Sequence, residues 1–343
     1  MRHRVVRVTA GSRLHFGMLS FGQPRERQFG GAGVMIAAPV TRLAIRESDA
    51  DSRRAAAQVG GTGSVAAAMC PNVSGPMADR VAEFVTRLSR QAAWWRRPAP
   101  FQIVVEAAPP AHAGLGSGTQ LGMALAMGLA AWCGAPPQSA AALAQAVGRG
   151  RRSAVGVHGA SLGGLIVEGG KLHDAEISPL VSRLALPDDW RFLLVLADHS
   201  AGLCGEAEQQ AFARLPPVPA AVSAALCREL VCELAPAAAR GDFERFSKSL
   251  YRYGRLAGEC FAARQGGVYA SPEIEQLVMR CRDLGVRGVG QSSWGPTVFA
   301  LCRDDAQAEA LSAALAAAGE LRQRTALITT PDNCGIKVDV TQD

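Results

Sequence analysis

A glycine-rich loop is the part of the sequence whose residue types and spacing point most directly to chemistry. It occupies residues 110–120, and its centre is formed by Gly114, Leu115, Gly116, Ser117, Gly118 and Thr119. Glycines let backbone N–H groups turn toward a phosphate, and the positive end of the helix that follows attracts an anion. These six residues are therefore predicted to bind phosphate, with Ser117 also contacting a metal ion. A strand-to-helix turn with a good cap is the simpler alternative.

The loop differs from two well-known nucleotide-binding loops. No Gly-Lys-Ser or Gly-Lys-Thr follows it, as the Walker A motif requires, and its glycines lack the Gly-x-Gly-x-x-Gly spacing of a dinucleotide site. Its glycines therefore predict a phosphate group but leave the rest of the ligand open.

Several charged and polar side chains elsewhere could complete a phosphate site. Arg149, Arg151 and Arg152 could neutralise phosphate charge, or they could form a solvated helix end. Glu206 and Glu208 could coordinate Mg²⁺ or bind sugar hydroxyls, although acidic residues in the first turn of a helix also favour its dipole.

Ser292 and Ser293 lie in a glycine-containing segment near a later strand pattern. Their hydroxyl groups could donate to a phosphate. Serine is also a common turn former and needs no ligand in that role.

Composition limits the class of protein. A length of 343 residues suggests two domains, and a net charge of +6 favours anionic ligands. The sequence contains no dense basic run of the kind that binds nucleic acid, and it contains no apolar stretch long enough to cross a membrane. The nine cysteines are spread singly without a Cys-x-x-Cys pair, which predicts reduced thiols in the cytoplasm and no structural zinc site.

The elements that must position these residues follow a mixed order. Strands are expected at 4–10, 39–47, 101–105, 162–170, 192–196, 297–301 and, as the last one, 323–329. Helices are expected at 76–93, 138–148, 205–214, 219–235, 241–263, 272–284 and 305–318. A further helix follows the loop, with Leu121, Leu125 and Leu129 on one face. This order predicts an α+β fold.

Two stretches resemble the GHMP superfamily, named for galactokinase, homoserine kinase, mevalonate kinase and phosphomevalonate kinase. The loop resembles its phosphate-loop signature, and residues 293–301 resemble its C-terminal motif. The resemblance implies a domain like ribosomal protein S5 domain 2 over residues 1–185, and a ferredoxin-like domain over residues 186–343.

Four further stretches resemble one branch, the β-ribofuranosylaminobenzene 5'-phosphate synthases: residues 12–17, 29–33, 202–212 and 290–296. This resemblance implies a transferase that condenses phosphoribosyl pyrophosphate with 4-aminobenzoate or a related aromatic acid. CO₂ and pyrophosphate are released in an early step of tetrahydromethanopterin biosynthesis, and Mg²⁺ is the expected cofactor.

The branch resemblance also implies roles for individual residues. Arg13 and His15 are expected to orient the carboxylate and the ring, and Glu206 completes the catalytic set. Substrate binding is expected of Gly30, Gly31, Arg151 and Glu208, with Glu208 and Ser117 as metal ligands.

Two other functions remain open from the sequence. The first is a small-molecule kinase that uses ATP. It is disfavoured because Gln145 and His158 stand near the positions of the kinases' magnesium-binding Glu and catalytic Asp. The second is a regulatory relative that binds ligand without turnover. A homodimer is expected because symmetric pairs are the commonest oligomers.

Overall fold

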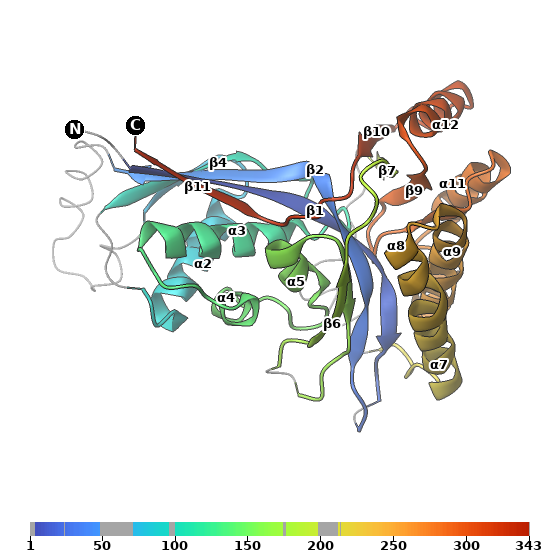
Figure 1. The fold of residues 1–343 in the computed structure, drawn as a ribbon, viewed down its shortest axis with the longest axis horizontal. Coiled ribbons are helices and arrows are strands. Elements are labelled where there is room, and N and C mark those ends of the chain that lie inside the picture. Colours follow the sequence, from blue (N-terminus) through green and yellow to red (C-terminus); the bar gives the residue numbers. More distant parts are fainter. Residues whose placement is uncertain are drawn as a thin grey trace.

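The computed structural model describes residues 4–23, 25–48, 71–95, 100–173, 176–197, 212 and 214–342. In this part of the chain the strands form two sheets. Figure 1 shows the larger sheet with its helices on one side of the molecule and the smaller sheet with its helices on the other. The mixed architecture confirms the predicted α+β class.

The larger sheet is built on a long antiparallel pair, β1 (Arg4–Ser20) and β2 (Phe29–Glu47). Its order is β11-β1-β2-β4-β3, and β5 and β6 extend it from the far part of β2. The remaining strands of this sheet are β3 (Asn72–Ser74), β4 (Phe101–Ala107), β5 (Leu165–Glu168), β6 (Leu180–Leu184) and β11 (Lys337–Gln342). The strands predicted at 4–10 and 39–47 are confirmed as parts of longer strands.

Four helices cover one face of this sheet: α2 (Ala78–Gln91), α3 (Ser117–Trp132), α4 (Ala140–Ala146) and α5 (Val155–Leu162). The central one, α3, is buried on nearly every side, and Leu121, Leu125 and Leu129 are fully buried as predicted. A methyl group at Gly128 would lie 2.7 Å from Cγ2 of Val8, so glycine lets α3 approach β1 closely.

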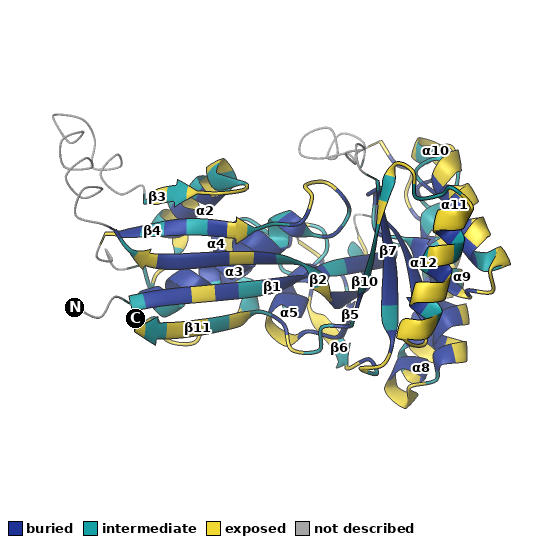
Figure 2. Cartoon of the chain, turned by 90° about the horizontal axis from the view of Figure 1, so that it is seen from above, coloured by how far each residue is buried: buried dark blue, intermediate teal, exposed yellow. Residues whose placement is uncertain are grey.

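The smaller sheet has the order β10-β7-β9-β8. Its strands are β7 (Arg191–Ala197), β8 (Gly288–Gln291), β9 (Val298–Cys302) and β10 (Arg324–Thr329). The helices of this half are α7 (Ala220–Arg228), the π-helix η2 (Glu229–Leu234), α8 (Ala235–Arg240), α9 (Phe243–Glu259), α10 (Ala262–Gln265), α11 (Pro272–Asp283) and α12 (Asp305–Ala317). Figure 2 shows α9, α11 and α12 with exposed outer faces and buried sides toward the protein.

Several predicted boundaries need correction. The strand at 323–329 is not the last, because β11 follows it and returns to pair with β1. The strand-like stretch at 162–170 contains the end of α5 before β5 begins. The helix predicted at 205–214 lies almost entirely outside the described residues. The predicted domain boundary at 185/186 lies between the strands of the larger sheet, β1 to β6, and those of the smaller sheet, β7 to β10. The exception is β11, which follows the smaller sheet in the chain but belongs to the larger one.

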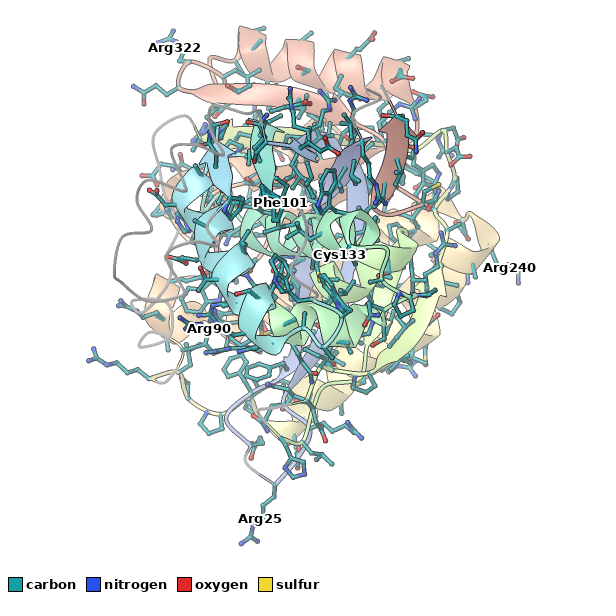
Figure 3. The ribbon with its side chains drawn as sticks, turned by 90° about the vertical axis from the view of Figure 1, so that its left-hand side faces the viewer. Arg25, Arg90, Phe101, Cys133, Arg240 and Arg322 are labelled. Atoms are coloured by element: carbon teal, nitrogen blue, oxygen red, sulfur yellow. The ribbon has the colours of Figure 1, made fainter. Side chains whose placement is uncertain are left out.

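Positive charge is spread around the outline of the protein. Figure 3 shows Arg25, Arg240 and Arg322 at separate places on the rim of the molecule, whereas Phe101 lies toward the middle. Among the described residues, no helix combines the length and apolar character needed to cross a membrane.

Candidate functional site

The glycine loop has the backbone geometry of an anion site. Gly114 and Gly116 have φ angles of 83° and 72°, in the left-handed region that favours glycine. Gly116 is the N-cap of α3, and no side chain caps the helix. Within the described residues, the N–H groups of Ser117 and Gly118 donate no hydrogen bond to another part of the chain. They are therefore available to an anion at the positive end of the helix dipole.

Arg13 on β1 holds this loop from one side. Its backbone N–H donates to the carbonyl of Leu115 at 3.0 Å, and its Nη1 donates to the carbonyl of Gly114 at 2.8 Å. A methyl group at Gly116 would lie 2.6 Å from Cγ of Arg13. The structure therefore brings the predicted Arg13 to the predicted loop and explains why residue 116 must lack a side chain.

The segment around Ser292 holds the loop from the other side. The Ser292 hydroxyl donates to the carbonyl of Gly114 at 2.8 Å and accepts from the backbone N–H of His15 at 3.0 Å. The Thr297 hydroxyl donates to the carbonyl of Ala113 at 2.6 Å. Because Ser292 is fully buried and its one proton is used, it orders the loop instead of donating to a phosphate as predicted.

Two guanidinium groups converge on the first turn of α3. A methyl group at Gly118 would lie 2.6 Å from Nη2 of Arg149 and 3.5 Å from Nη2 of Arg80. Both arginines also lie over the ring of Phe84, with Cζ 5.2 Å and 5.8 Å from its centroid. The absence of a side chain at residue 118 thus makes room for cationic groups beside the free N–H groups.

The sequence located only part of this cationic cluster. Of the three neighbouring arginines, Arg149 lies at the loop, Arg152 lies over Phe212 at 4.9 Å, and Arg151, the predicted substrate-binding residue, is exposed to solvent. Arg80 was missed, because nothing in the α2 sequence distinguishes it from other helix-surface arginines.

The described residues at the loop suit an anion better than a protein-held metal ion. Ser117 is buried at the start of α3, between Gly116, which lies against Arg13, and Gly118, which lies against Arg149 and Arg80. No group of three His, Cys, Asp or Glu side chains able to hold a metal ion occurs among the described residues. Glu206 and Glu208 lie outside the described residues, so the metal site predicted for Ser117 and Glu208 remains a prediction.

A pocket lies next to the loop and shares a turn with it. Its apolar lining includes Met18, Phe261 and Trp294, and its polar lining includes His15 and Ser293. The space within the pocket and its open mouth, solvent included, is about 450 Å³. The rings of Phe261 and Trp294 meet edge to face at 5.1 Å.

Ser293 belongs to the turn that joins the pocket to the loop. Its φ angle is 57°, and its backbone N–H donates to the carbonyl of His15 at 3.1 Å. Ser293 is half-buried and lines the pocket. The predicted contact of Ser293 with a phosphate remains a prediction.

A chain of polar groups, buried at both ends and half-buried at Ser153, extends from His15 away from the pocket. The imidazole Nε2 lies 3.1 Å from the Ser153 hydroxyl, which donates to Oε1 of Glu168 at 2.6 Å. The backbone N–H of Ala154 donates to Oε2 of Glu168 at 2.7 Å. Sequence reasoning missed Ser153 and Glu168; the one available signal was an acidic residue ending the apolar strand β5.

Burial shifts the pKa values of both ends of this chain. It lowers the pKa of His15 well below its usual value, and the positive charge of Arg13 adds to this effect. Burial raises the pKa of the Glu168 carboxyl, although hydrogen bonds from Ser153, Ala154 and Ser178 act in the opposite direction. His15 is therefore neutral near pH 7.

The glycines at 30 and 31 have a packing role. A methyl group at Gly30 would lie 2.9 Å from the backbone nitrogen of Gly170, and one at Gly31 would lie 2.2 Å from the carbonyl oxygen of Gly17. Close approach of neighbouring strands accounts for both glycines, and their substrate-binding role remains a prediction.

The residues compared with kinase catalytic positions have other surroundings. Gln145 is exposed on α4. His158 on α5 has its Nε2 at 2.7 Å from the carbonyl oxygen of Ser178 and must donate to it.

Family models match both halves of the chain. The model described as the GHMP kinases N terminal domain matches residues 78–164, and the one described as GHMP kinases C terminal matches residues 234–321. Among curated proteins, the chain is 26% identical to the β-ribofuranosylphenol 5'-phosphate synthase of Archaeoglobus fulgidus, over 98% of this chain and 100% of that protein. It is 25% identical to the synthase of the same name from Methanothermobacter thermautotrophicus, over 86% of this chain and 88% of that protein.

Solved structures show the same fold at lower identity. Homoserine kinase from Cytophaga hutchinsonii aligns with a TM-score of 0.62 and 15% identity, covering 98% of this chain and 97% of that one. Mevalonate diphosphate decarboxylase from Staphylococcus aureus aligns with a TM-score of 0.63 and 14% identity, covering 98% of each chain. Because these two proteins catalyse different reactions on one fold, the fold does not determine the reaction.

Proposed function

Because the chain belongs to the GHMP superfamily and resembles its synthase branch, we propose that it is a β-ribofuranosylarene 5'-phosphate synthase. It joins the C1 carbon of phosphoribosyl pyrophosphate to the ring carbon of a para-substituted benzoate, with loss of CO₂ and pyrophosphate. The similarity to the A. fulgidus synthase along 98% of the chain carries this proposal.

The glycine loop suits the phosphate-bearing substrate. As the bond from ribose to pyrophosphate breaks, negative charge grows on the leaving group and must be neutralised. The N–H groups of Ser117 and Gly118, together with the guanidinium groups of Arg80 and Arg149, supply that neutralisation at the first turn of α3. Arg13 stabilises the loop that presents them.

The neighbouring pocket suits the aromatic acid. Phe261 and Trp294 offer ring faces and edges to a benzoate, and His15 and Ser293 offer polar atoms. An amino or hydroxyl group para to the carboxylate pushes electrons toward the attacking carbon, and loss of CO₂ restores aromaticity. The archaeal relatives are named for a ribofuranosylphenol product, which adds 4-hydroxybenzoate to the 4-aminobenzoate expected from the sequence.

Three further points are also proposals, the first two from the resemblance and the third because symmetric pairs are the commonest oligomers. The product serves tetrahydromethanopterin biosynthesis, Mg²⁺ enters with the diphosphate and uses Glu206 or Glu208 as ligands, and the active protein is a homodimer. Mg²⁺ would supply charge neutralisation on the diphosphate. Metal-dependent turnover and a light-scattering mass test the second and third points.

The main test is a product assay on the purified protein. Phosphoribosyl pyrophosphate and carboxyl-labelled 4-aminobenzoate or 4-hydroxybenzoate should yield labelled CO₂ and pyrophosphate in equal amounts. Consumption of ATP without release of CO₂ would instead establish the small-molecule kinase. Binding of phosphoribosyl pyrophosphate without turnover in either assay would establish a regulatory relative.

A further inference from the structure

We infer that His15, Ser153 and Glu168 form a proton relay that serves the hydroxyl group of a 4-hydroxybenzoate-type substrate. The inference rests on the proposed function and deepens it, because it assigns residues to one of the two candidate aromatic acids. His15 is the residue that contacts the substrate, while Ser153 and Glu168 are positioning residues that act through it.

The geometry forms a continuous path of hydrogen bonds. His15 lines the pocket, and its Nε2 lies 3.1 Å from the Ser153 hydroxyl. That hydroxyl lies 2.6 Å from the Glu168 carboxylate, which is completely buried at the end of β5. A separation of 2.6 Å is typical of a hydroxyl group donating to a charged oxygen.

The hydrogen-bond pattern assigns the tautomer of His15. Ser153 has one proton, and an ionised Glu168 can only accept, so that proton points at Glu168. The Ser153 oxygen also accepts from the backbone N–H of Val155 at 3.2 Å. His15 must therefore donate from Nε2, which leaves the lone pair on Nδ1 free. Within the described part of the chain, Nδ1 makes no hydrogen bond.

A free lone pair on a residue that lines the pocket can accept the substrate's hydroxyl proton. As Nδ1 takes this proton, the Nε2 proton passes to the Ser153 oxygen and the Ser153 proton passes to Glu168. The path therefore moves one positive charge from the pocket to a buried carboxylate. An imidazolium does not have to persist in a site that disfavours it.

The proton movement balances the bond changes of the reaction. The ring carbon bearing the carboxylate bonds to C1 of ribose, and the bond from C1 to pyrophosphate oxygen breaks with its electron pair on pyrophosphate. The hydroxyl oxygen, having given its proton to Nδ1, supplies electrons to the ring. The bond to the carboxylate then breaks, CO₂ leaves, its electron pair restores the ring, and the oxygen recovers the proton. No net proton is consumed.

The surroundings of the relay favour this direction of transfer. Burial lowers the pKa of His15 with help from Arg13, and burial raises the pKa of Glu168. Among the described residues, His158 from α5 and the buried Tyr253 from α9 also interact with Glu168. An amino substituent needs no such relay, because neutral nitrogen donates its electron pair without losing a proton.

The competing explanation is structural, since Glu168 also accepts from Ala154 immediately before α5. Two variants separate the explanations: Ser153→Ala breaks the path, and Glu168→Gln keeps the shape but cannot accept the proton. Ser178→Ala is the matched control, because Ser178 also hydrogen-bonds to Glu168 but lies outside the path to His15. Ser153→Thr restores the hydroxyl group and should rescue Ser153→Ala.

The experiment measures single-turnover release of CO₂ from both aromatic acids with each variant. Loss of general acid–base assistance predicts a fall of at least about 100-fold with 4-hydroxybenzoate for Ser153→Ala and Glu168→Gln. The rate with 4-aminobenzoate should change less than about threefold and reports that the variant is folded. The ratio of the two rates should be unchanged in Ser178→Ala.

Three results would overturn the relay. Equal losses with both acids would identify a structural role, and unchanged rates with both would exclude the path. A wild-type protein that releases CO₂ only from 4-aminobenzoate would remove the substrate of the relay while leaving the synthase intact. A wild-type protein that turns over neither acid would instead refute the proposed function itself.

Discussion

Replacing Gly116 by alanine tests the central premise that the loop backbone presents N–H groups to a phosphate. Gly116 has a φ of 72°, and its new methyl group would lie 2.6 Å from Cγ of Arg13. Arg13 would have to move, and its hydrogen bond from Nη1 to the Gly114 carbonyl would be lost or lengthened. The substitution therefore disturbs both the loop conformation and the group that fixes it.

The magnitude follows from these two effects. A left-handed alanine costs about 1–2 kcal/mol of stability. The lost hydrogen bond involves a charged donor and contributes about 1.5–3 kcal/mol to holding the loop in place. If binding must restore that loop conformation, the same free energy corresponds to a roughly 10- to 150-fold weaker Kd. We expect the Kd for phosphoribosyl pyrophosphate, or for pyrophosphate as a probe, to rise at least about tenfold.

Gly134 provides a matched control at the other end of α3. Its φ is 63°, and a methyl group there would meet no atom within 4 Å. Gly134→Ala should therefore lose only the part of the free energy of unfolding that comes from left-handed strain, about 1–2 kcal/mol in urea, while leaving the calorimetric Kd unchanged. If the two variants bind pyrophosphate equally well, the loop does not present the phosphate-binding groups.

Three other perturbations address the cations, the pocket and the buried histidine. Arg149→Gln should weaken pyrophosphate binding about tenfold and reduce its salt dependence, whereas Arg151→Gln, at an exposed position, should not; equal titration curves would contradict the assignment. Phe261→Leu removes an aromatic contact worth about 0.5–1.5 kcal/mol, so the KM for the aromatic acid should rise several-fold while the KM for phosphoribosyl pyrophosphate stays constant. The pKa of His15 is lowered in the folded protein, so below pH 6.5 the unfolded chain binds a proton at this residue that the folded chain does not bind. The free energy of unfolding therefore falls as the pH drops from 6.5 toward the pKa of the folded state. Urea unfolding of His15→Gln between pH 7 and 5 should lack this part of the decline; a decline identical to wild type would show that His15 titrates normally.

Local signals in the sequence predicted the elements that carry the loop. The spacing of Leu121, Leu125 and Leu129 gave the buried face of α3, and the apolar run at 192–196 gave β7. These patterns succeed because burial on one helical face or in a central strand acts on consecutive residues.

The long strands were only partly predictable because their glycines resemble turns. Gly17 and Gly33 interrupt the apolar pattern of β1 and β2, yet each lies where another part of the chain approaches closely. A methyl group at Gly17 would lie 2.2 Å from Cβ of Ala257, and one at Gly33 would lie 2.3 Å from the carbonyl oxygen of Leu14. Only tertiary packing distinguishes such a glycine from one in a turn. The edge strand β11 is mostly exposed, so it lacks the sustained apolar pattern by which a strand is recognised in a sequence.

The candidate site was predictable where a motif lies within one segment and unpredictable where it is assembled across the fold. Gly114 and Gly116 are visible as a loop, and Arg13 and His15 were found through a resemblance. Arg80 and Ser153 carry no local mark, and Glu168 is marked only as an acidic residue at the end of an apolar strand, because their importance depends on which residues the fold places beside them.

The turn at residues 291–294 connects the two halves of the site physically. The Ser292 hydroxyl bonds to the Gly114 carbonyl in the loop, and the adjacent Ser293 and Trp294 line the pocket. His15 is bound to the same turn through both its backbone N–H and its carbonyl. A displacement of this turn would therefore change the phosphate loop and the aromatic pocket together. Ser292, which the sequence suggested as a phosphate ligand, is better understood as the residue that fixes the glycine loop relative to His15 and the neighbouring pocket.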